Sequence, residues 1–242
     1  MGLVSDTLVF VPAWNEEGSL PAVLEELAAE LPDADVLVVD DGSTDRTADV
    51  ARVHGAEVHS LGTNLGLRFG IAAGYRYALE HGYAYCGRVD ADGQHPPREL
   101  ARLLAMVRRG ECDVAVGSRF VSGEGYPAYR YLSSPARRFG TAVLRRAMRL
   151  VLGRTFGDAT SGLYAVNALA LPLLAETYTS RAPEVEALVR IAKAGLHLEE
   201  VPVVMEARAS GESKLRGSKA VKLVVTVAGT LLAAKIVRSR RS

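Results

Sequence analysis

The sequence predicts an α/β fold in which helices flank a mostly parallel sheet. Short apolar runs typical of strands alternate with helical patterns over the first half of the chain. Polar or acidic residues follow three of these runs, at Asn15, Asp40 and Asp90. The length of 242 residues and the 48% hydrophobic content fit one α/β domain with a substantial core.

Each element of the first half is predicted from hydrophobic periodicity and from the turn residues beside it. Ser43 or Thr44 is positioned to cap the helix after the second strand. Gly70 and Gly74 are predicted to let the next helix pack closely on the sheet. The predicted strands are Thr7–Pro12, Asp35–Val39, Glu57–Ser60, Tyr83–Val89 and Asp113–Gly117, and the predicted helices are Glu16–Leu31, one ending at His54, Phe69–His81 and one from Pro96 through Arg109.

The second half of the chain lacks this regular alternation. A stretch rich in Gly, Tyr, Ser and Pro predicts a loop over Gly123–Ser134, and the loop that contains Asp158 follows an Arg-rich segment. The remaining predictions are helices over Pro135–Leu152, Ala168–Thr177, Pro183–Ala194 and Ser218–Arg238, and a strand over Leu198–Met205.

Composition limits the classes of protein to which the chain can belong. Cys86 and Cys112 lie in or beside apolar segments without Cys-x-x-Cys spacing, which predicts buried free thiols in a reducing compartment. The N-terminus lacks the pattern of a secretory signal, and no apolar run reaches the ~18–20 residues of a membrane-spanning helix. We therefore expect a cytoplasmic protein, and we expect no nucleic-acid partner.

Charge is distributed unevenly along the chain. The formal net charge is +1, yet the segment from Arg208 to the end holds nine basic residues and one acidic residue, Glu212. Such a basic segment indicates an anionic partner, such as a pyrophosphate, a phospholipid headgroup or a phosphorylated acceptor. An ordinary solvated helix end is the alternative.

Asp90 and Asp92 form the most informative motif. Two carboxylates one residue apart at the end of a strand point the same way, and such a pair suits a divalent cation that also binds a diphosphate. A lone pair of this kind would also fit a solvated turn. Here, Pro12–Glu17 and Val38–Asp45 also bring polar groups to strand ends. Together the three segments predict a nucleotide-binding crevice at the carboxyl edge of an open α/β sheet.

These segments resemble those of family 2 glycosyltransferases of the GT-A fold, in particular the branch of dolichyl- and polyprenyl-phosphate sugar synthases. The resemblance extends from about residue 7 to about residue 216. The ordered motifs that carry it are Pro12–Glu17, Asp40–Asp45, Asn64–Gly66, Asp90–Pro96, Gly117–Arg119, Asp158–Gly162, Glu184 and Arg208–Lys214.

The resemblance implies a metal-dependent, inverting enzyme. It would move a sugar from a UDP- or GDP-linked donor to a polyprenyl or dolichyl phosphate-type acceptor. Asp92 would ligate Mg²⁺ or Mn²⁺ directly, Gln94 would contribute an oxygen, and Asp90 would face both the metal and the ribose. Ala91 belongs to the same nucleotide-sugar-binding segment.

Other motif residues would bind the nucleotide. By resemblance, Asp41 would read uracil or guanine beside Pro12 and Glu16. Trp14 stands where the family usually has Tyr, and it either stacks on the base or belongs to the core. Asp40 either serves the same site or caps a turn.

The basic residues of the later motifs would clamp phosphates. Arg119 and Arg208 suit bidentate contacts, and Lys214 would add a point charge. Asp158 is either a base for an acceptor hydroxyl or a group that orients the acceptor and nearby basic residues. Glu184 and Glu186 are secondary candidates for contacts with sugar hydroxyls. His95 is expected to be a structural loop residue.

We divide the chain into a catalytic domain over residues 1–217 and a basic amphipathic helix over 218–242. That helix would lie on the inner face of the membrane, pack on the sheet or form a dimer contact. Two alternatives remain for the function. One is a soluble family 2 enzyme acting on a small-molecule or glycan hydroxyl, and the other is a non-catalytic nucleotide-sugar-binding protein. A nucleotidyltransferase would need a Gly-rich phosphate loop that the first strand lacks.

Overall fold

The structure is a computed structural model that describes residues 5–126, 146, 149 and 155–206. The predicted helices over Pro135–Leu152 and Ser218–Arg238 lie outside the described residues, apart from two positions of the first. The Arg208–Lys214 motif lies outside them as well. Within the part of the chain that the structure describes, no helix is long and apolar enough to cross a membrane.

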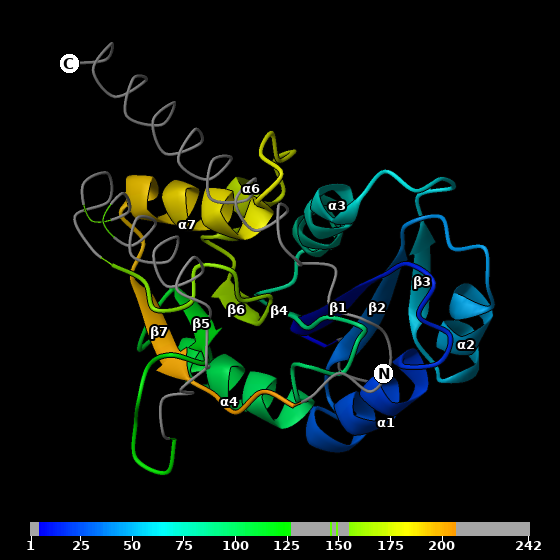
Figure 1. Ribbon diagram of the computed structural model, residues 1–242, viewed down its shortest axis with the longest axis horizontal. Helices are drawn as coiled ribbons and strands as arrows, with labels where there is room; N and C mark the ends of the chain where they lie inside the picture. The colour runs from blue at the N-terminus through cyan, green and yellow to red at the C-terminus, as the bar shows by residue number, and fades with distance from the viewer. Residues whose placement is uncertain (1–4, 127–145, 147–148, 150–154, 207–242) are drawn as a thin grey trace, which may run out of the picture.

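One mixed sheet forms the centre of the molecule (Figure 1). Within the described residues it has seven strands in the order β3-β2-β1-β4-β6-β5-β7. Neighbouring strands are parallel, except that β6 runs antiparallel to both β4 and β5. The strands are β1 (Thr7–Ala13), β2 (Asp35–Asp40), β3 (Glu57–Ser60), β4 (Tyr85–Arg88), β5 (Val114–Ser118), β6 (Tyr164–Asn167) and β7 (Leu198–Pro202).

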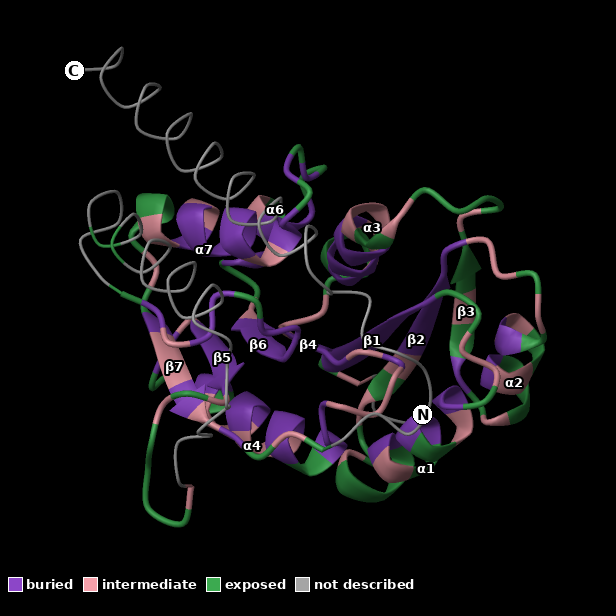
Figure 2. Ribbon diagram, viewed as in Figure 1, coloured by how far each residue is buried: buried purple, intermediate pink, exposed green. Residues whose placement is uncertain are grey.

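Helices cover both faces of this sheet, so the fold has three layers (Figure 1). One layer holds α3 (Leu67–Glu80), α6 (Leu171–Leu174) and α7 (Pro183–Ala194), and the other holds α1 (Leu20–Glu30), α2 (Thr47–Val53) and α4 (Pro97–Arg108). Alternate residues of β1 supply the two cores, because successive side chains of a strand point to opposite faces. Leu8 and Phe10 face α3, whereas Val9 and Val11 face α1 and α4. Figure 2 shows the resulting buried centre.

Close packing of α3 on the sheet depends on a glycine, as the sequence predicts. A Cβ atom at Gly74 would overlap the ring of Phe10 on β1. Phe10 also contacts Tyr75 edge-on, with ring centroids 4.8 Å apart. The absence of a side chain at Gly74 therefore sets how closely α3 approaches β1.

Most predicted elements are confirmed, and four features differ. The helix expected to start at Glu16 starts at Leu20, because residues 17–19 form a turn and Asn15 has a φ of 55°. Neither Ser43 nor Thr44 caps α2, whose N-cap is Arg46. The helix expected over Ala168–Thr177 is reduced to α6, and β6 occupies residues that we did not predict as a strand.

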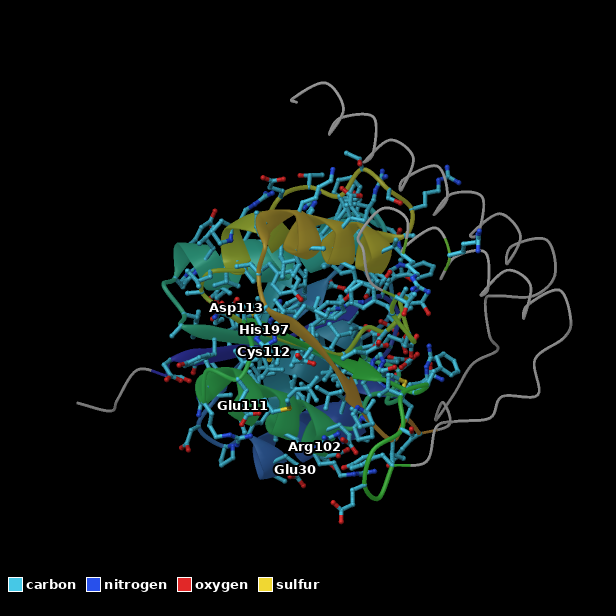
Figure 3. All side chains as sticks on the ribbon, turned by 90° about the vertical axis from the view of Figure 1, so that its left-hand side faces the viewer. Glu30, Arg102, Glu111, Cys112, Asp113 and His197 are labelled. Atoms are coloured by element: carbon cyan, nitrogen blue, oxygen red, sulfur yellow. The ribbon has the colours of Figure 1, made fainter. Side chains whose placement is uncertain are left out.

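The beginnings of β5 and β7 are held together by Asp113. Its carboxylate accepts hydrogen bonds from the His197 backbone N–H and from the Asn167 side-chain amide, both at 2.8 Å. Figure 3 shows Asp113, His197 and Cys112 close together at this end of the sheet. Cys112 and Cys86 are buried free thiols, as predicted.

Candidate active site

The predicted site residues gather at one edge of the sheet. Strands β1, β2, β4 and β5 are parallel, so the residues after each strand emerge at the same edge. The strands are added toward one edge of the sheet from β1 to β3, and β4 is then added on the other side of β1. Open α/β sheets form a ligand crevice at such a change in strand order. Because β6 is antiparallel, it is the loop before β6 that reaches this edge. That loop carries Asp158.

The loops after β1 and β2 are tied to each other. The Asn15 N–H donates to Ser43 Oγ at 3.0 Å, and the Thr44 N–H donates to Asn15 Oδ1 at 2.8 Å. The Glu16 N–H donates to Thr47 Oγ1 at 2.9 Å. Ser43 and Thr44 therefore serve the neighbouring loop instead of capping α2. The two motifs form one rigid wall of the site.

Asp40 and Asp41 are both buried, and both hold backbone loops. Asp40 accepts the Ser43 N–H at 3.0 Å, so it does close a turn. Asp41 accepts the Leu65 and Gly66 N–H groups at 2.7 and 2.8 Å. Gly42 has a φ of 68°, and a Cβ there would overlap the backbone of residue 63. Gly42 thus lets the Asn64–Gly66 segment approach Asp41.

Asp90 belongs to a network of charged side chains at the end of β4. Arg88 Nη2 lies 3.1 Å from Asp90 Oδ1 and 3.1 Å from Glu184 Oε1. His95 Nδ1 faces Asp90 Oδ2 at 3.3 Å. Burial alone would raise the pKa of Asp90, but the Arg88 guanidinium and the His95 ring outweigh it and hold the pKa well below its ordinary value. Asp90 is therefore a fixed anion at neutral pH.

The Asp158–Gly162 motif packs directly on this carboxylate. A Cβ atom at Gly162 would clash with both carboxylate oxygens of Asp90. Gly162 immediately precedes Leu163 and β6, so the antiparallel strand brings the motif to the end of β4. Two segments that are far apart in the sequence thus meet at Asp90.

Asp92 and Gln94 occupy the turn that follows. The Gln94 N–H donates to Asp92 Oδ1 at 3.1 Å, and Gly93 within the turn has a φ of 73°. Both side chains are partly exposed. The turn therefore presents a carboxylate and an amide to solvent at the same edge of the sheet as Asp90.

Arg119 and Asp158 form a bidentate ion pair. Arg119 Nε and Nη2 lie 2.6 and 2.8 Å from the two oxygens of Asp158, and Thr160 Oγ1 donates to Asp158 at 3.2 Å. Asp158 is only 3% exposed, whereas the side chain of Arg119 is 32% exposed. The carboxylate is thus engaged on both oxygens and fixes the orientation of a guanidinium that solvent can reach.

Glu200 on β7 holds the backbone beside this ion pair. Its carboxylate accepts the Gly157 N–H at 2.8 Å and the Asp158 N–H at 2.7 Å. The loop that carries Asp158 is therefore anchored to the neighbouring strand.

Comparison with known proteins decides the family. Residues 8–167 match the profile of the family described as Glycosyl transferase family 2. The chain belongs to glycosyltransferase family 2.

Two named relatives match nearly the whole chain. An undecaprenyl-phosphate mannosyltransferase of Micrococcus luteus is 37% identical over 94% of this chain and 95% of its own length. A polyprenol monophosphomannose synthase of Mycolicibacterium smegmatis is 32% identical over 97% of this chain and 90% of its own. The chain is therefore a glycosyltransferase of the polyprenyl-phosphate sugar synthase branch.

Solved structures place it in the GT-A fold. A glucosyl-3-phosphoglycerate synthase of Mycobacterium tuberculosis, in complex with Mn²⁺, UDP and phosphoglyceric acid, aligns with a TM-score of 0.69 and 20% identity. The alignment covers 94% of this chain and 78% of that one. At this identity the likeness establishes the fold alone, and it confirms the predicted architecture.

The structure locates most of the residues predicted for this family 2 site. Pro12 is buried within β1, and the Glu16 carboxylate accepts a hydrogen bond from the Ser19 hydroxyl at 2.7 Å. Trp14 is 42% exposed, so the alternative that it belongs to the core is wrong. Ala91 is buried between the two aspartates. Arg208 and Lys214 lie outside the described residues.

Two residues of this family 2 site were missed in the sequence. Arg88 is an arginine inside an apolar strand, and its side chain is 2% exposed, a placement that requires acidic partners nearby. That signal was present in the segment Tyr83–Val89. Glu200 carries no comparable signal, because its role depends on the pairing of β7 with β5.

Of the two secondary candidates, only Glu184 reaches this network. Glu186 instead accepts the Ser180 N–H at 2.6 Å and pairs with Arg190 at 2.7 Å, so it organises the loop before α7.

Proposed function

We propose that this glycosyltransferase moves a sugar from a UDP- or GDP-linked donor to the phosphate of a polyprenyl lipid, with inversion and with a divalent cation. The observation that carries the choice of acceptor is the Arg119–Asp158 pair. A hydroxyl acceptor needs a base to remove its proton, whereas a lipid phosphate is already an anion near neutral pH. Asp158 is buried and both of its oxygens are hydrogen-bonded, so it is better placed to orient Arg119 than to remove a proton from an acceptor.

Arg119 has the character of a phosphate ligand. Its guanidinium is held in one orientation by Asp158, so little side-chain entropy would be lost on binding a phosphate. At this position it would hold the acceptor phosphate or stabilise the departing diphosphate. Arg208 and Lys214 are proposed to add positive charge around the same phosphates.

The nucleotide is proposed to bind across the ends of β2, β1 and β4. Asp41 and Asp90 follow strands on either side of β1, which corresponds to a separation of about 10 Å across two strand spacings. Asp41 would accept from the base, Trp14 would stack on it, and Pro12, Glu16 and Ala91 would line the floor.

The residues at the end of β4 fit Mg²⁺ or Mn²⁺, since carboxylate and amide oxygens are the ligands these ions prefer. Asp92 and Gln94 would hold the cation, and Asp90 would face it. Within the described residues, no group of three or more His, Cys, Asp or Glu side chains could hold a metal alone, so the donor diphosphate would complete the coordination. Once bound, the cation would neutralise the departing diphosphate.

The relatives support this proposal. The Micrococcus and Mycolicibacterium proteins are named for undecaprenyl phosphate and polyprenol monophosphomannose, and the Mycobacterium tuberculosis structure holds UDP and Mn²⁺. The two named relatives are mannose enzymes, so GDP- and UDP-hexoses are the first donors to test.

The test is turnover of a panel of UDP- and GDP-sugars with Mg²⁺ or Mn²⁺, with and without a short polyprenyl phosphate. We expect release of the nucleoside diphosphate to require the lipid phosphate and the cation. Donor turnover that does not depend on the lipid phosphate would indicate that the acceptor is a soluble hydroxyl. Absence of binding and turnover with every donor would contradict the proposed function.

A further inference from the structure

Arg88 is an unusual component of this site. It lies on a central strand, its side chain is 2% exposed, and its Nε makes no hydrogen bond within the described residues. Burying a guanidinium is costly, and a buried ion pair adds little stability compared with apolar side chains of similar volume. A structural role alone therefore does not account for an arginine at this position. Its only charged partners at ion-pair distance, among the described residues, are Asp90 and Glu184.

Three groups confine the Asp90 carboxylate. Arg88 contacts Oδ1 at 3.1 Å, His95 faces Oδ2 at 3.3 Å, and Gly162 leaves just enough space for both oxygens. Glu184, in the first turn of α7, contacts the same Nη2 atom of Arg88 at 3.1 Å. The carboxylate, whose side chain is 30% exposed, cannot rotate toward a new ligand without breaking its hydrogen bond with Arg88.

This confinement has a consequence for a cation beside Asp92. Asp90 and Glu184 together compensate the charge of Arg88, so part of the negative charge of Asp90 is already offset before an ion arrives. The guanidinium lies 3.1 Å from Asp90 and repels a cation bound nearby. Because this region is partly buried, water screens the repulsion less than it would at an exposed surface. A cation without nucleotide would therefore meet a weak site, to which the diphosphate of the donor adds both ligands and negative charge.

We propose that Arg88 is a positioning residue of the donor site, which holds Asp90 out of direct cation coordination and so makes cation binding depend on the nucleotide. Asp92 is then the direct carboxylate ligand, and Asp90 acts as a fixed acceptor for the donor or for water on the cation. The identity of the nucleotide rests on the proposed function, whereas the effect of Arg88 on the cation alone does not.

The test is Mn²⁺ binding to the full chain, followed by the electron paramagnetic resonance signal of free Mn²⁺, with and without UDP or GDP. For the wild type we expect weak binding of Mn²⁺ alone and at least about tenfold tighter binding with one of the nucleotides. Arg88→Met should tighten the binding of Mn²⁺ alone by about three- to tenfold, because a unit positive charge near the cation is removed and Asp90 is released. It should also reduce the nucleotide effect.

A matched control separates this effect from a general change in charge or packing. Arg190→Met removes another largely buried arginine, which pairs with Glu186 on α7 and not with Asp90. It should leave Mn²⁺ binding unchanged. If Arg88→Met does not fold, as judged by circular dichroism, the double variant Arg88→Met with Glu184→Leu removes the unpaired carboxylate and supplies the same measurement.

A purely structural role predicts that Arg88→Met leaves the binding of Mn²⁺ alone unchanged or weakens it. Folded Arg88→Met protein that binds Mn²⁺ alone no better than the wild type would overturn the role of Arg88 and leave the proposed function standing. Equal tightening in Arg190→Met would overturn it as well. A wild type in which neither UDP nor GDP strengthens Mn²⁺ binding would instead overturn the nucleotide coupling and the proposed donor class together.

Discussion

At the scale of single residues, the site is organised by carboxylates that hold other groups in place. Asp41 fixes the Asn64–Gly66 segment, Asp158 fixes Arg119, and Glu200 fixes the loop around Asp158. These contacts satisfy buried charges and also leave the binding groups in one conformation before substrate arrives. Asp92, in its partly exposed turn, is the carboxylate that we assign to the cation.

Asp92→Ala tests that assignment. We expect it to abolish turnover and the cation dependence of donor binding, because it removes the carboxylate ligand together with the acceptor of the Gln94 N–H. Donor binding by calorimetry, with and without Mn²⁺, is the measurement. Full activity in this variant would remove Asp92 from the metal site.

Asp158→Asn tests whether this carboxylate orients Arg119. The amide keeps the volume but loses the charge-assisted bidentate pair, so kcat should fall about 100-fold, the scale of losing one preorganised electrostatic contact. Binding of the nucleoside diphosphate should change little. If Asp158 were instead a base, kcat for Asp158→Asn should recover as the pH rises, because added hydroxide can replace a base but not a positioning contact. A flat pH profile is the result that we expect.

At the scale of elements, sequence patterns predict regular segments well and local departures poorly. The elements over Glu57–Ser60 and Pro183–Ala194 have the bounds expected from the sequence. The missed strand β6 has only four residues and owes its place to pairing with β4 and β5, which local periodicity cannot reveal. The same strand brings Asp158 and Gly162 to the site. Their role could therefore be suggested by resemblance, whereas their contacts could not be predicted.

The contact between α3 and β1 gives a prediction at this scale. Gly74→Ala should lower the free energy of unfolding by about 1–3 kcal/mol, because the added methyl group overlaps the Phe10 ring in a close-packed layer. Gly18→Ala is the matched control, since a Cβ at Gly18 meets no atom within 4 Å and its φ is not positive. Urea denaturation of both variants measures the difference. Equal midpoints would contradict the packing argument.

At the scale of the whole molecule, we propose that residues 1–217 form the catalytic domain and that the basic helix over residues 218–242 binds a membrane surface. Residues 218–242 carry Lys219, Lys222 and Lys235 around an apolar run. We expect the full chain to co-sediment with vesicles that contain phosphatidylglycerol and not with neutral vesicles. Added salt should weaken this binding.

Replacing these three lysines by Gln should weaken vesicle binding by about 100-fold, at about 1 kcal/mol for each charge near the surface. Vesicle binding that is unaffected by the substitutions would contradict the role of these lysines. A wild type that does not bind anionic vesicles would contradict the membrane role and favour a contact within the protein or a dimer.

The central claim is that the acceptor is a lipid phosphate, and the most direct measurement is the mass of the lipid product. The enzyme would be incubated with its donor, Mn²⁺ and either a polyprenyl phosphate or the corresponding polyprenol, which lacks only the phosphate. We predict one added hexose on the polyprenyl phosphate and none on the polyprenol. Equal transfer to both lipids, or to neither in the presence of donor turnover, would contradict the account.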